Sequence, residues 1–205
     1  KSAFLMYDVL IIGAGAAGMS CALVLGSAHQ KAFASDKKIG LIAHQKSSHL
    51  QTALFNNVLG LNPGTLGSEV LTSGLNQLKT HYPHVDQIVG QKVLEIKENT
   101  DSFKLITNTS TVSAKLIVVS LGYTNAFVIK GLEDYVEAHP KAKAEKQRIQ
   151  LRNTDHLVKE GIYVAGTLAG WRSQFAIATG SGASVATDIL TLWNNGEHVK
   201  VHDKI

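Results

Sequence analysis

The chain has 205 residues, of which 44% are hydrophobic and 18% charged, and its formal net charge is +4. This length allows one large domain or two small ones, and the composition is that of a globular protein with a sizeable core rather than of a disordered chain. Basic residues are scattered and aromatic residues make up only 6%, which disfavours a nucleic-acid-binding face, where basic residues gather with stacking aromatics.

The first predicted element is a buried strand. Residues 7–12 form a short apolar run rich in β-forming side chains, as in a strand covered on both faces of a parallel sheet. Glycines follow at Gly13, Gly15 and Gly18, and residues 16–28 are small and apolar with good helix propensity. Strand, glycine turn and helix therefore succeed one another without a gap.

The second strand has two candidate positions. Residues 38–44 form the stronger apolar run, and residues 32–36 form a weaker and earlier one. A helix is then predicted over residues 67–82, where apolar side chains recur at helical spacing.

The rest of the chain predicts three strand-like pieces, a connection, a strand and a long helix. The three pieces are residues 91–97, 102–108 and 111–120, which together read as a β-meander that ends in a buried run closed by Gly122. Residues 123–151 are irregular and partly charged, and we expect a connection with one exposed helix. A short buried strand over 161–166 and a helix over 175–193 follow. The predicted fold is a single three-layer α/β domain of Rossmann-like type over residues 1–205, with a parallel sheet, helices on one side and the β-meander on the other.

The glycine turn carries the clearest chemical signal. In a G-x-G-x-x-G turn between a strand and a helix, the first glycine permits the tight turn, the second lets a pyrophosphate approach the backbone, and the third lets the helix pack close to the strand. The free N–H groups of the helix then face the phosphates. We therefore expect a dinucleotide over Gly13, Ala14, Gly15, Ala16, Ala17 and Gly18.

The residue that would meet the adenosine ribose has two candidates. An acidic residue normally lies about 20 positions beyond the first glycine, and Asp36 lies near that distance. If the second strand is the later run, its end carries His44 and Gln45 instead. The later run has the stronger strand signal and favours His44 and Gln45, but Asp36 stays open.

With these segments placed, the chain resembles the FAD-dependent pyridine nucleotide-disulfide oxidoreductases, in particular the thioredoxin reductase-like branch. Three motifs carry the resemblance in the right order: YDVLIIGAGAAG at 7–18, TVSAKLIVVSLG at 111–122, and Thr154 followed by GIYVAGT at 161–167 and by QFA and GSG in the last helix. Together they span nearly the whole chain, which makes the resemblance far more specific than the glycine turn alone.

The resemblance implies FAD as the cofactor. The pyrophosphate would lie over the glycine turn, the adenine near Lys92 and Val93, and the isoalloxazine near the start of the last helix. The further residues that it implies at the flavin are Asn56, Gly122, Gly166, Thr167, Trp171, Gln174, Phe175 and Ala176.

Three departures from the family pattern bear on activity. Residues 123–151 stand where the family has an NADPH-binding domain and are too short for one. Cys21 is the single cysteine, so the redox dithiol is missing and no internal disulfide or cysteine-rich zinc site can form. Thr167 replaces an aspartate that holds the ribityl chain, which weakens that hydrogen bond.

The expected function is that of a FAD-binding oxidoreductase-like flavoprotein that is not a disulfide reductase by itself. Its electrons would come from free NAD(P)H or from a redox partner protein, and a homodimer is compatible with the resemblance. The alternative is a non-catalytic dinucleotide-binding sensor or subunit of a redox complex, and a third reading is NAD(P) in the glycine site. No catalytic residue is identified. We expect no metal site, because the nine histidines show no ligand spacing, and no membrane span or signal peptide, which makes the cytoplasm the expected location.

Overall fold

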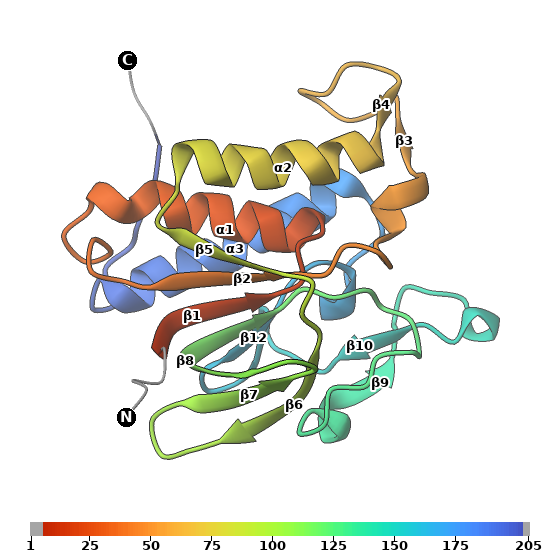
Figure 1. Ribbon diagram of the computed structural model, residues 1–205. Coiled ribbons are helices and arrows are strands. Elements are labelled where there is room, and N and C mark those ends of the chain that lie inside the picture. The colour runs from red at the N-terminus through yellow and green to blue at the C-terminus, as the bar shows by residue number, and fades with distance from the viewer. Residues whose placement is uncertain (1–5, 203–205) are drawn as a thin grey trace.

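The computed structural model describes residues 6–202, and its centre is a mostly parallel β-sheet (Figure 1). The order across the sheet is β11-β12-β8-β1-β2-β5. Neighbours from β12 to β5 run parallel, and among these six strands β11 alone is antiparallel to its neighbour. The bounds of these six strands are β1 Met6–Ile12, β2 Ile39–Ala43, β5 Val85–Val89, β8 Thr111–Val119, β11 Leu157–Lys159 and β12 Ile162–Val164.

The central strand β1 explains why the sheet is buried on both faces. Val9, Leu10 and Ile11 are fully buried, although successive side chains of a strand point to opposite faces. A strand without a polar face is stable only between two covering layers, as the apolar run predicted.

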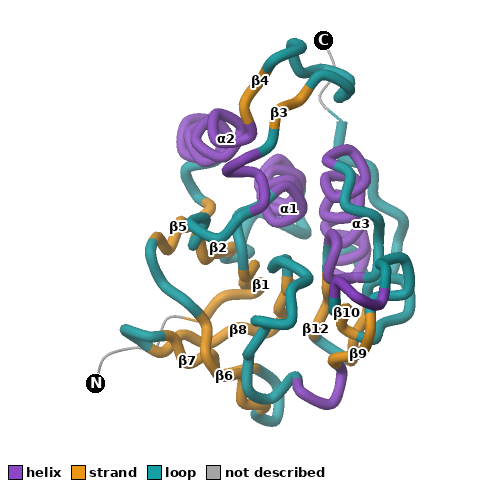
Figure 2. Tube along the Cα trace, turned by 90° about the vertical axis from the view of Figure 1, so that its right-hand side faces the viewer, coloured by secondary structure: helices purple, strands orange, loops and turns teal. Residues whose placement is uncertain are grey.

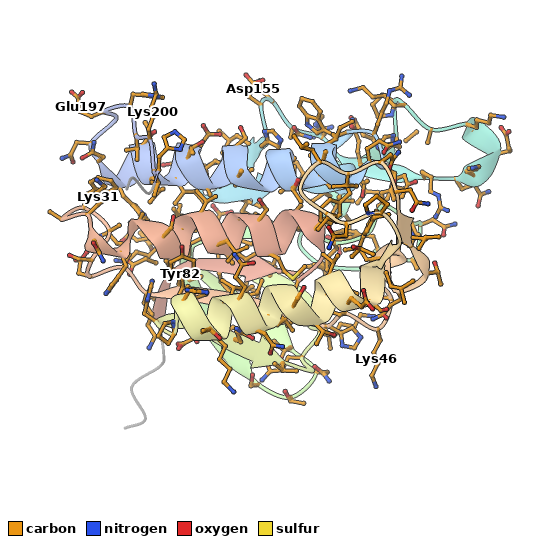
Figure 3. All side chains as sticks on the ribbon, turned by 90° about the horizontal axis from the view of Figure 1, so that it is seen from above. Lys31, Lys46, Tyr82, Asp155, Glu197 and Lys200 are labelled. Carbon is orange, nitrogen blue, oxygen red and sulfur yellow. The ribbon has the colours of Figure 1, made fainter. Side chains whose placement is uncertain are left out.

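Three helices cover one face of the sheet: α1 Ala16–Ser27, α2 Gly67–His81 and α3 Phe175–Trp193. Seen from above they lie side by side, with α1 between the other two (Figure 3). Small residues let α1 and α3 approach closely, because a Cβ at Gly182 would overlap the carbonyl oxygen of Ala17. The apolar core beneath the helices therefore depends on the small residues that the sequence places in both.

The other face is covered by the β-meander and by the connection (Figure 2). Strands β6 Val93–Glu98 and β7 Phe103–Thr107 are antiparallel, and β7 pairs with the first half of β8. The second half of the same β8 edge pairs with β12. β8 thus belongs to both layers, and the expected arrangement of helices on one side and a meander on the other is confirmed.

The second strand lies at the later of its two candidate positions. β2 begins at Ile39, and all five of its residues are buried between β1 and β5. Residues 32–36 form turns before it.

The connection over residues 123–151 differs from the expected irregular segment with one exposed helix. It contains two single-turn 3-10 helices, Glu133–Tyr135 and Ala144–Lys146, and two short antiparallel strands, β9 Val136–Ala138 and β10 Ile149–Leu151. A second pair of short strands, β3 Leu54–Phe55 and β4 Thr65–Leu66, and the strands β5 and β11 were also not predicted. Five of these strands, β11 included, have only two or three residues, which carry too little pattern to be read from a sequence, and β5, with five residues, has only one buried residue and no apolar run.

α3 is the one described helix that is long and apolar enough to cross a membrane, with a mean hydropathy of 1.3 over the tested window. The sequence analysis expects no uncharged apolar stretch of this length, and α3 does not contradict it because Asp188 interrupts the apolar run, so the expectation of no membrane span stays a prediction. Val185, Ala186, Ile189 and Leu190 are nevertheless buried in the core against α1, and the core helix of a globular domain passes the same test.

Candidate functional site

Two cavities meet at the carboxyl ends of β1, β2 and β8 and together form one groove. The first has a volume of about 240 Å³ and the second about 270 Å³. They share six lining residues: Gly13, His44, Ser47, His49, Leu121 and Gly122. In a parallel α/β sheet, ligands bind beyond the carboxyl ends of the strands, so the groove lies where a ligand is expected.

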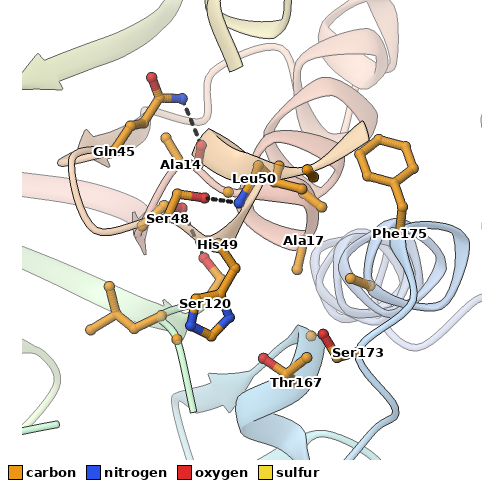
Figure 4. A pocket seen from close by; sticks show the side chains of 18 of the residues that line it. Ala14, Ala17, Gln45, Ser48, His49, Leu50, Ser120, Thr167, Ser173 and Phe175 are labelled. Atoms are coloured by element: carbon orange, nitrogen blue, oxygen red, sulfur yellow. Dashed lines mark hydrogen bonds between the residues drawn. The ribbon is translucent and has the colours of Figure 1, made fainter. Parts of the chain in front are cut away.

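The glycine turn forms one wall of the first cavity (Figure 4). Gly13 has φ +105°, and an added Cβ would lie 2.7 Å from the carbonyl oxygen of Ser120. A Cβ at Gly18 would overlap the carbonyl oxygen of Gly13, so this glycine lets α1 pack onto the turn from behind. Gly15 is different, because the atom nearest to its added Cβ is Ser48 Oγ at 3.9 Å. Space is therefore open at the second glycine, where a pyrophosphate would approach the backbone.

Ser120 fixes the turn from β8. Its hydroxyl lies 3.0 Å from the carbonyl oxygen of Ile12 and 2.9 Å from that of Gly13, and its side chain is buried. Ser120 belongs to the second motif of the sequence but was not predicted as a site residue. Only the pairing of β8 with β1 shows that the two motifs meet.

The end of β2 places His44 and Gln45 at the groove. The Gln45 side-chain amide donates 2.7 Å to the carbonyl oxygen of Ala14, which commits this side chain to holding the turn. His44 lines both cavities. Asp36 precedes the amino end of β2, at the end of the strands opposite to the groove. It is exposed and pairs with Lys37 at 3.1 Å. Of the two ribose candidates, the geometry brings His44 and Gln45 to the groove and separates Asp36 from it.

His49 is a lining residue that the sequence analysis missed. It begins the single-turn 3-10 helix His49–Thr52, where Ser48 Oγ accepts from the N–H of Leu50 at 3.3 Å. Its imidazole points into the first cavity on the side of Ser173 and Thr167 (Figure 4), and it lines the second cavity as well. Nothing in the sequence around His49 distinguishes it from the loop histidines.

The C-terminal part of the chain forms the opposite wall. Gly166 and Thr167 open the 3-10 helix Gly166–Ala169, and Gln174 and Phe175 start α3. The Phe175 ring packs on Phe55 with ring centroids 4.8 Å apart. No side chain caps the N-terminus of α1 or of α3, so both helices leave their first N–H groups available at the first cavity.

The second cavity contains the predicted adenine-side residues. Lys92 and Val93 line it together with Gly122, and the backbone N–H of Lys92 donates to Asn108 Oδ1 at 2.8 Å. The predicted positions from Lys92 to Phe175 thus lie along one continuous groove.

Four predicted residues besides Asp36 lie outside the groove. Gly18 lies behind the turn, and Asn56 accepts from the N–H of Gly64 at 2.8 Å, which ties the β3–β4 loop together. Trp171 and Ala176 line a different cavity on the other side of α3. Phe175 lines the groove, whereas Ala176, turned by about 100° around the axis of α3, lines the cavity on the other side of the helix.

His139 attaches the connection to the loop after β12. Its Nδ1 accepts from the N–H of Lys141 at 3.1 Å, so its Nε2 carries the proton and donates to the carbonyl oxygens of Thr167 at 3.0 Å and Trp171 at 3.2 Å. The Tyr123 ring stands edge-on to both His139 and His49, at 5.3 and 5.7 Å. The connection is therefore an ordered part of the wall beside the groove.

The charge of the groove favours an anionic ligand. Among the described residues, no aspartate or glutamate lines either cavity, whereas Lys92, His44 and His49 do. Burial raises the pKa of the Cys21 thiol well above its usual range, which leaves it protonated and inert. The part of the chain that the structure describes holds no group of three or more potential metal ligands.

Comparisons with known proteins identify the family of the chain and the relatives of its fold. The sequence profile of the pyridine nucleotide-disulphide oxidoreductase family matches residues 7–184. A ferredoxin–NADP reductase of Leuconostoc mesenteroides is 26% identical over 194 residues, which are 94% of this chain and 51% of that protein. The chain therefore spans about half the length of this curated relative.

Solved structures share the fold at low sequence identity. A thioredoxin reductase from Gloeobacter violaceus matches with a TM-score of 0.75 at 12% identity, over 98% of this chain and 99% of that one. An oxidoreductase from Agrobacterium tumefaciens matches with a TM-score of 0.71 at 15% identity, over 94% and 100%. A ferredoxin-flavin thioredoxin reductase from Clostridium acetobutylicum matches with 0.66 at 17% identity, over 93% and 98%.

Proposed function

The chain belongs to the pyridine nucleotide-disulphide oxidoreductase family, and from this premise we propose that it binds FAD along the groove and transfers electrons between an external donor and an external acceptor. One observation carries the proposal. The groove runs without a lining carboxylate from Lys92, past the glycine turn, to the start of α3. Such a lining, with a glycine turn at a helix N-terminus, suits the negative charge of a dinucleotide diphosphate.

The residues present fit the parts of FAD in order. The open backbone at Gly15 and the free N–H groups of α1 suit the pyrophosphate, and Lys92 and Val93 suit the adenine end. His44, which lines both cavities, would hydrogen-bond the adenosine ribose, while Gln45 keeps the turn in shape. FAD, when bound, supplies reversible uptake of a hydride or of single electrons.

At the other end of the groove, Thr167, Gln174 and Phe175 would hold the flavin. The free N–H groups at the start of α3 would stabilise negative charge on the flavin, and Phe175, which packs on Phe55, would shield it from water. Thr167 offers a hydroxyl rather than a carboxylate to the ribityl chain, so we expect weaker cofactor retention than with a charged partner.

The electron donor and acceptor come from outside the described domain. No second glycine motif occurs in the sequence, and the connection over 123–151 is too short for a second nucleotide-binding domain. The matched relative is named a ferredoxin–NADP reductase, which supports free NAD(P)H or a small redox protein as the donor. Cys21 is buried and offers no dithiol chemistry.

Identification of the bound nucleotide tests the proposal. Purified protein, with FAD added and then removed from solution, is expected to keep the yellow absorbance of oxidised flavin, and chromatography of the denatured extract should give FAD. Gly15→Ala, which places a methyl group in the open space of the turn, should weaken FAD binding about ten-fold or more. Gly180→Ala, where nothing lies within 4 Å of the added Cβ, is the matched control. A colourless protein that takes up no FAD would overturn the proposal, and NAD(P) in the extract would assign the groove to that nucleotide.

A second candidate function is non-catalytic dinucleotide sensing, alone or as a subunit of a redox complex. Thr167 and the missing dithiol favour it. Photoreduction followed by an NAD(P)H-oxidation assay separates the two, because an enzyme turns over with some acceptor and a sensor binds FAD without turnover.

A further inference from the structure

A separate cavity of about 510 Å³ lies on the outer side of α3, and we call it the outer cavity. Asp155 lies at this side of the helix, away from α1 (Figure 3). Small residues of α3 line one side of the outer cavity, and residues 155, 156 and 171 line the other. The lining residues are Asp155, His156, Trp171, Ala176, Ile177, Gly180, Ser181, Ser184 and Asp188. Two residues of this set, His156 and Ser181, are buried polar residues that the proposed function does not use.

His156 occupies its position against a backbone preference. Its φ is +71°, and that of Asp155 is +47°, so two successive residues with side chains adopt the left-handed conformation that favours glycine. The His156 side chain is only 6% exposed, and its ring stacks on Trp171 with planes within 2° and centroids 5.7 Å apart. The imidazole is thus held in one orientation by its surroundings.

A chain of hydrogen bonds leads from His156 to the groove. His156 Nε2 lies 2.8 Å from Ser181 Oγ, and the same oxygen accepts from the backbone N–H of Gly166 at 2.8 Å. Gly166 lines the first cavity of the groove and Ser181 lines the outer cavity. Because Gly166 already donates to the serine oxygen, the serine proton is free to point at a neutral His156 Nε2.

The groups that face His156 favour its neutral form at neutral pH. Burial lowers the pKa of His156, and the carboxylates of Asp155 and Asp188 oppose this only in part. Asp188 comes from α3, where burial raises its pKa, and it also faces the Tyr163 phenol. Lys141 Nζ lies 5.0 Å from the centroid of the Trp171 ring, so a cation is present on that side as well.

We propose that His156 is a positioning residue which, through Ser181, orients the Gly166–Thr167 backbone and thereby sets how tightly the groove holds FAD. The inference rests on the proposed function, because it concerns the affinity for that cofactor. This role explains why a histidine rather than a glycine occupies the left-handed backbone position at 156. A glycine has no side chain that could accept a hydrogen bond from the Ser181 hydroxyl. Protonation would turn Nε2 into a donor, so the Ser181 hydroxyl would have to rotate its proton away from the imidazole. This rotation changes the hydrogen bond that Ser181 Oγ accepts from the Gly166 N–H.

FAD affinity of matched variants tests this inference. We expect Ser181→Ala and His156→Ala to weaken FAD binding about three- to ten-fold at pH 8, the fold-change that corresponds to one hydrogen bond. His156→Gln, which keeps a hydrogen-bonding group but does not titrate, should restore binding to within two-fold. Ser184→Ala removes a serine one helical turn away from Ser181 and is the control that should bind as the unmodified chain does.

The pH dependence separates positioning from a merely structural role. The FAD affinity of the unmodified chain divided by that of His156→Gln should change between pH 8 and pH 5. When both proteins also carry Ser181→Ala, the corresponding ratio should stay constant over the same range. Any pH effect that is common to the two proteins compared cancels in these ratios. In the protein without FAD, hydrogen exchange at the Gly166 amide should be faster in Ser181→Ala than in Ser184→Ala.

Three results would overturn the inference. In the first, the unmodified chain binds FAD and the folded variants Ser181→Ala and His156→Ala bind it equally well. That result leaves the proposed function intact. Another is a lower thermal midpoint in His156→Ala with unchanged affinity, pH ratio and Gly166 exchange, which assigns the residue to stability alone. An unmodified chain that binds no FAD removes both proposals.

Discussion

Gly13, Gly15 and Gly18 serve different purposes although the motif treats them alike. Gly13 needs its positive φ, Gly18 needs the absence of a Cβ against the Gly13 carbonyl, and Gly15 faces open space. Substitution should therefore separate folding from binding. Gly15 is a position where ligand binding changes and the fold does not, whereas Gly18 is a position where the fold itself changes.

We predict that Gly18→Ala destabilises the protein by about 1–3 kcal/mol, because the added methyl group forces α1 away from the turn. The free energy of unfolding from urea denaturation measures this. Gly180→Ala, at an exposed position of a helix, should instead stabilise by up to about 1 kcal/mol. Equal stability of Gly18→Ala and the unmodified chain would show that the turn can relax.

Single residues also mark the limits of sequence reasoning at the site. Gln45 was predicted to meet a ribose, but its amide is committed to the Ala14 carbonyl. His49 and Ser120 were missed because each reaches the groove only through strand pairing or through a one-turn helix far from the glycine motif. The motif residues could be predicted because they are close together in the sequence. Their partners could not, because they meet the motif only in the folded protein.

At the level of elements, long patterns were readable and short ones were not. α2 and α3 begin where the periodicity places them, and β1 and β8 follow apolar runs. The choice between residues 32–36 and 38–44 was settled by pairing, since β2 fits between β1 and β5 only with the later run. β9 and β10 have three residues each, so their hairpin is defined by its contacts rather than by propensity.

The connection should be held in place by His139. We predict that His139→Ala leaves the Thr167 and Trp171 carbonyls without their donor and loosens the backbone of residues 140–148, so that trypsin cleaves faster at the exposed lysines of this segment. Limited proteolysis with mass spectrometry should detect faster cleavage there than in His81→Ala, an exposed histidine of α2. Identical cleavage rates in the two variants would contradict this role.

A stacked histidine pair joins the end of α1 to the segment before β5. His84 Nε2 lies 3.0 Å from the Gly26 carbonyl oxygen, and the His29 ring lies 4.1 Å from the His84 ring. Burial and the neighbouring His29 lower the pKa of His84 below its ordinary value of 6.5.

This pair predicts a loss of stability in acid. A histidine whose pKa is lower in the folded state binds fewer protons there than in the unfolded chain, so stability is full above pH 6.5 and falls as the pH drops below it. Urea denaturation between pH 8 and pH 5 should show a smaller decrease for His84→Gln than for the unmodified chain. An equal decrease in both would assign the acid sensitivity to other groups.

At the scale of the whole molecule, charge is divided between the two sides of α3. The groove has no lining carboxylate among the described residues, whereas the outer cavity has Asp155 and Asp188. An anionic cofactor is therefore favoured on one side of the helix only. This division could not be read from the net charge of +4, because it arises from the way in which the elements are assembled.

FAD should stabilise the whole domain, since ligand binding to the folded state alone adds free energy by mass action. At a FAD concentration of about 100 times the dissociation constant, the added stability is about 2.7 kcal/mol. Thermal denaturation with FAD should show a clear rise of the midpoint, and with AMP at equal concentration a smaller one. Equal shifts would indicate that only the adenine end of the groove is used.

The two ends of the connection over residues 123–151 lie side by side, because the N–H of Ile149 donates to the carbonyl oxygen of Tyr123 at 2.9 Å. The polypeptide leaves the core after β8 and returns to the same point. Residues 124 and 126–129, which follow directly, line the second cavity, and His139 holds the loop after β12, so both parts are needed for the groove. The exposed residues 143–147 between them are therefore the place where a folded module with adjacent termini can be inserted while the groove keeps its lining.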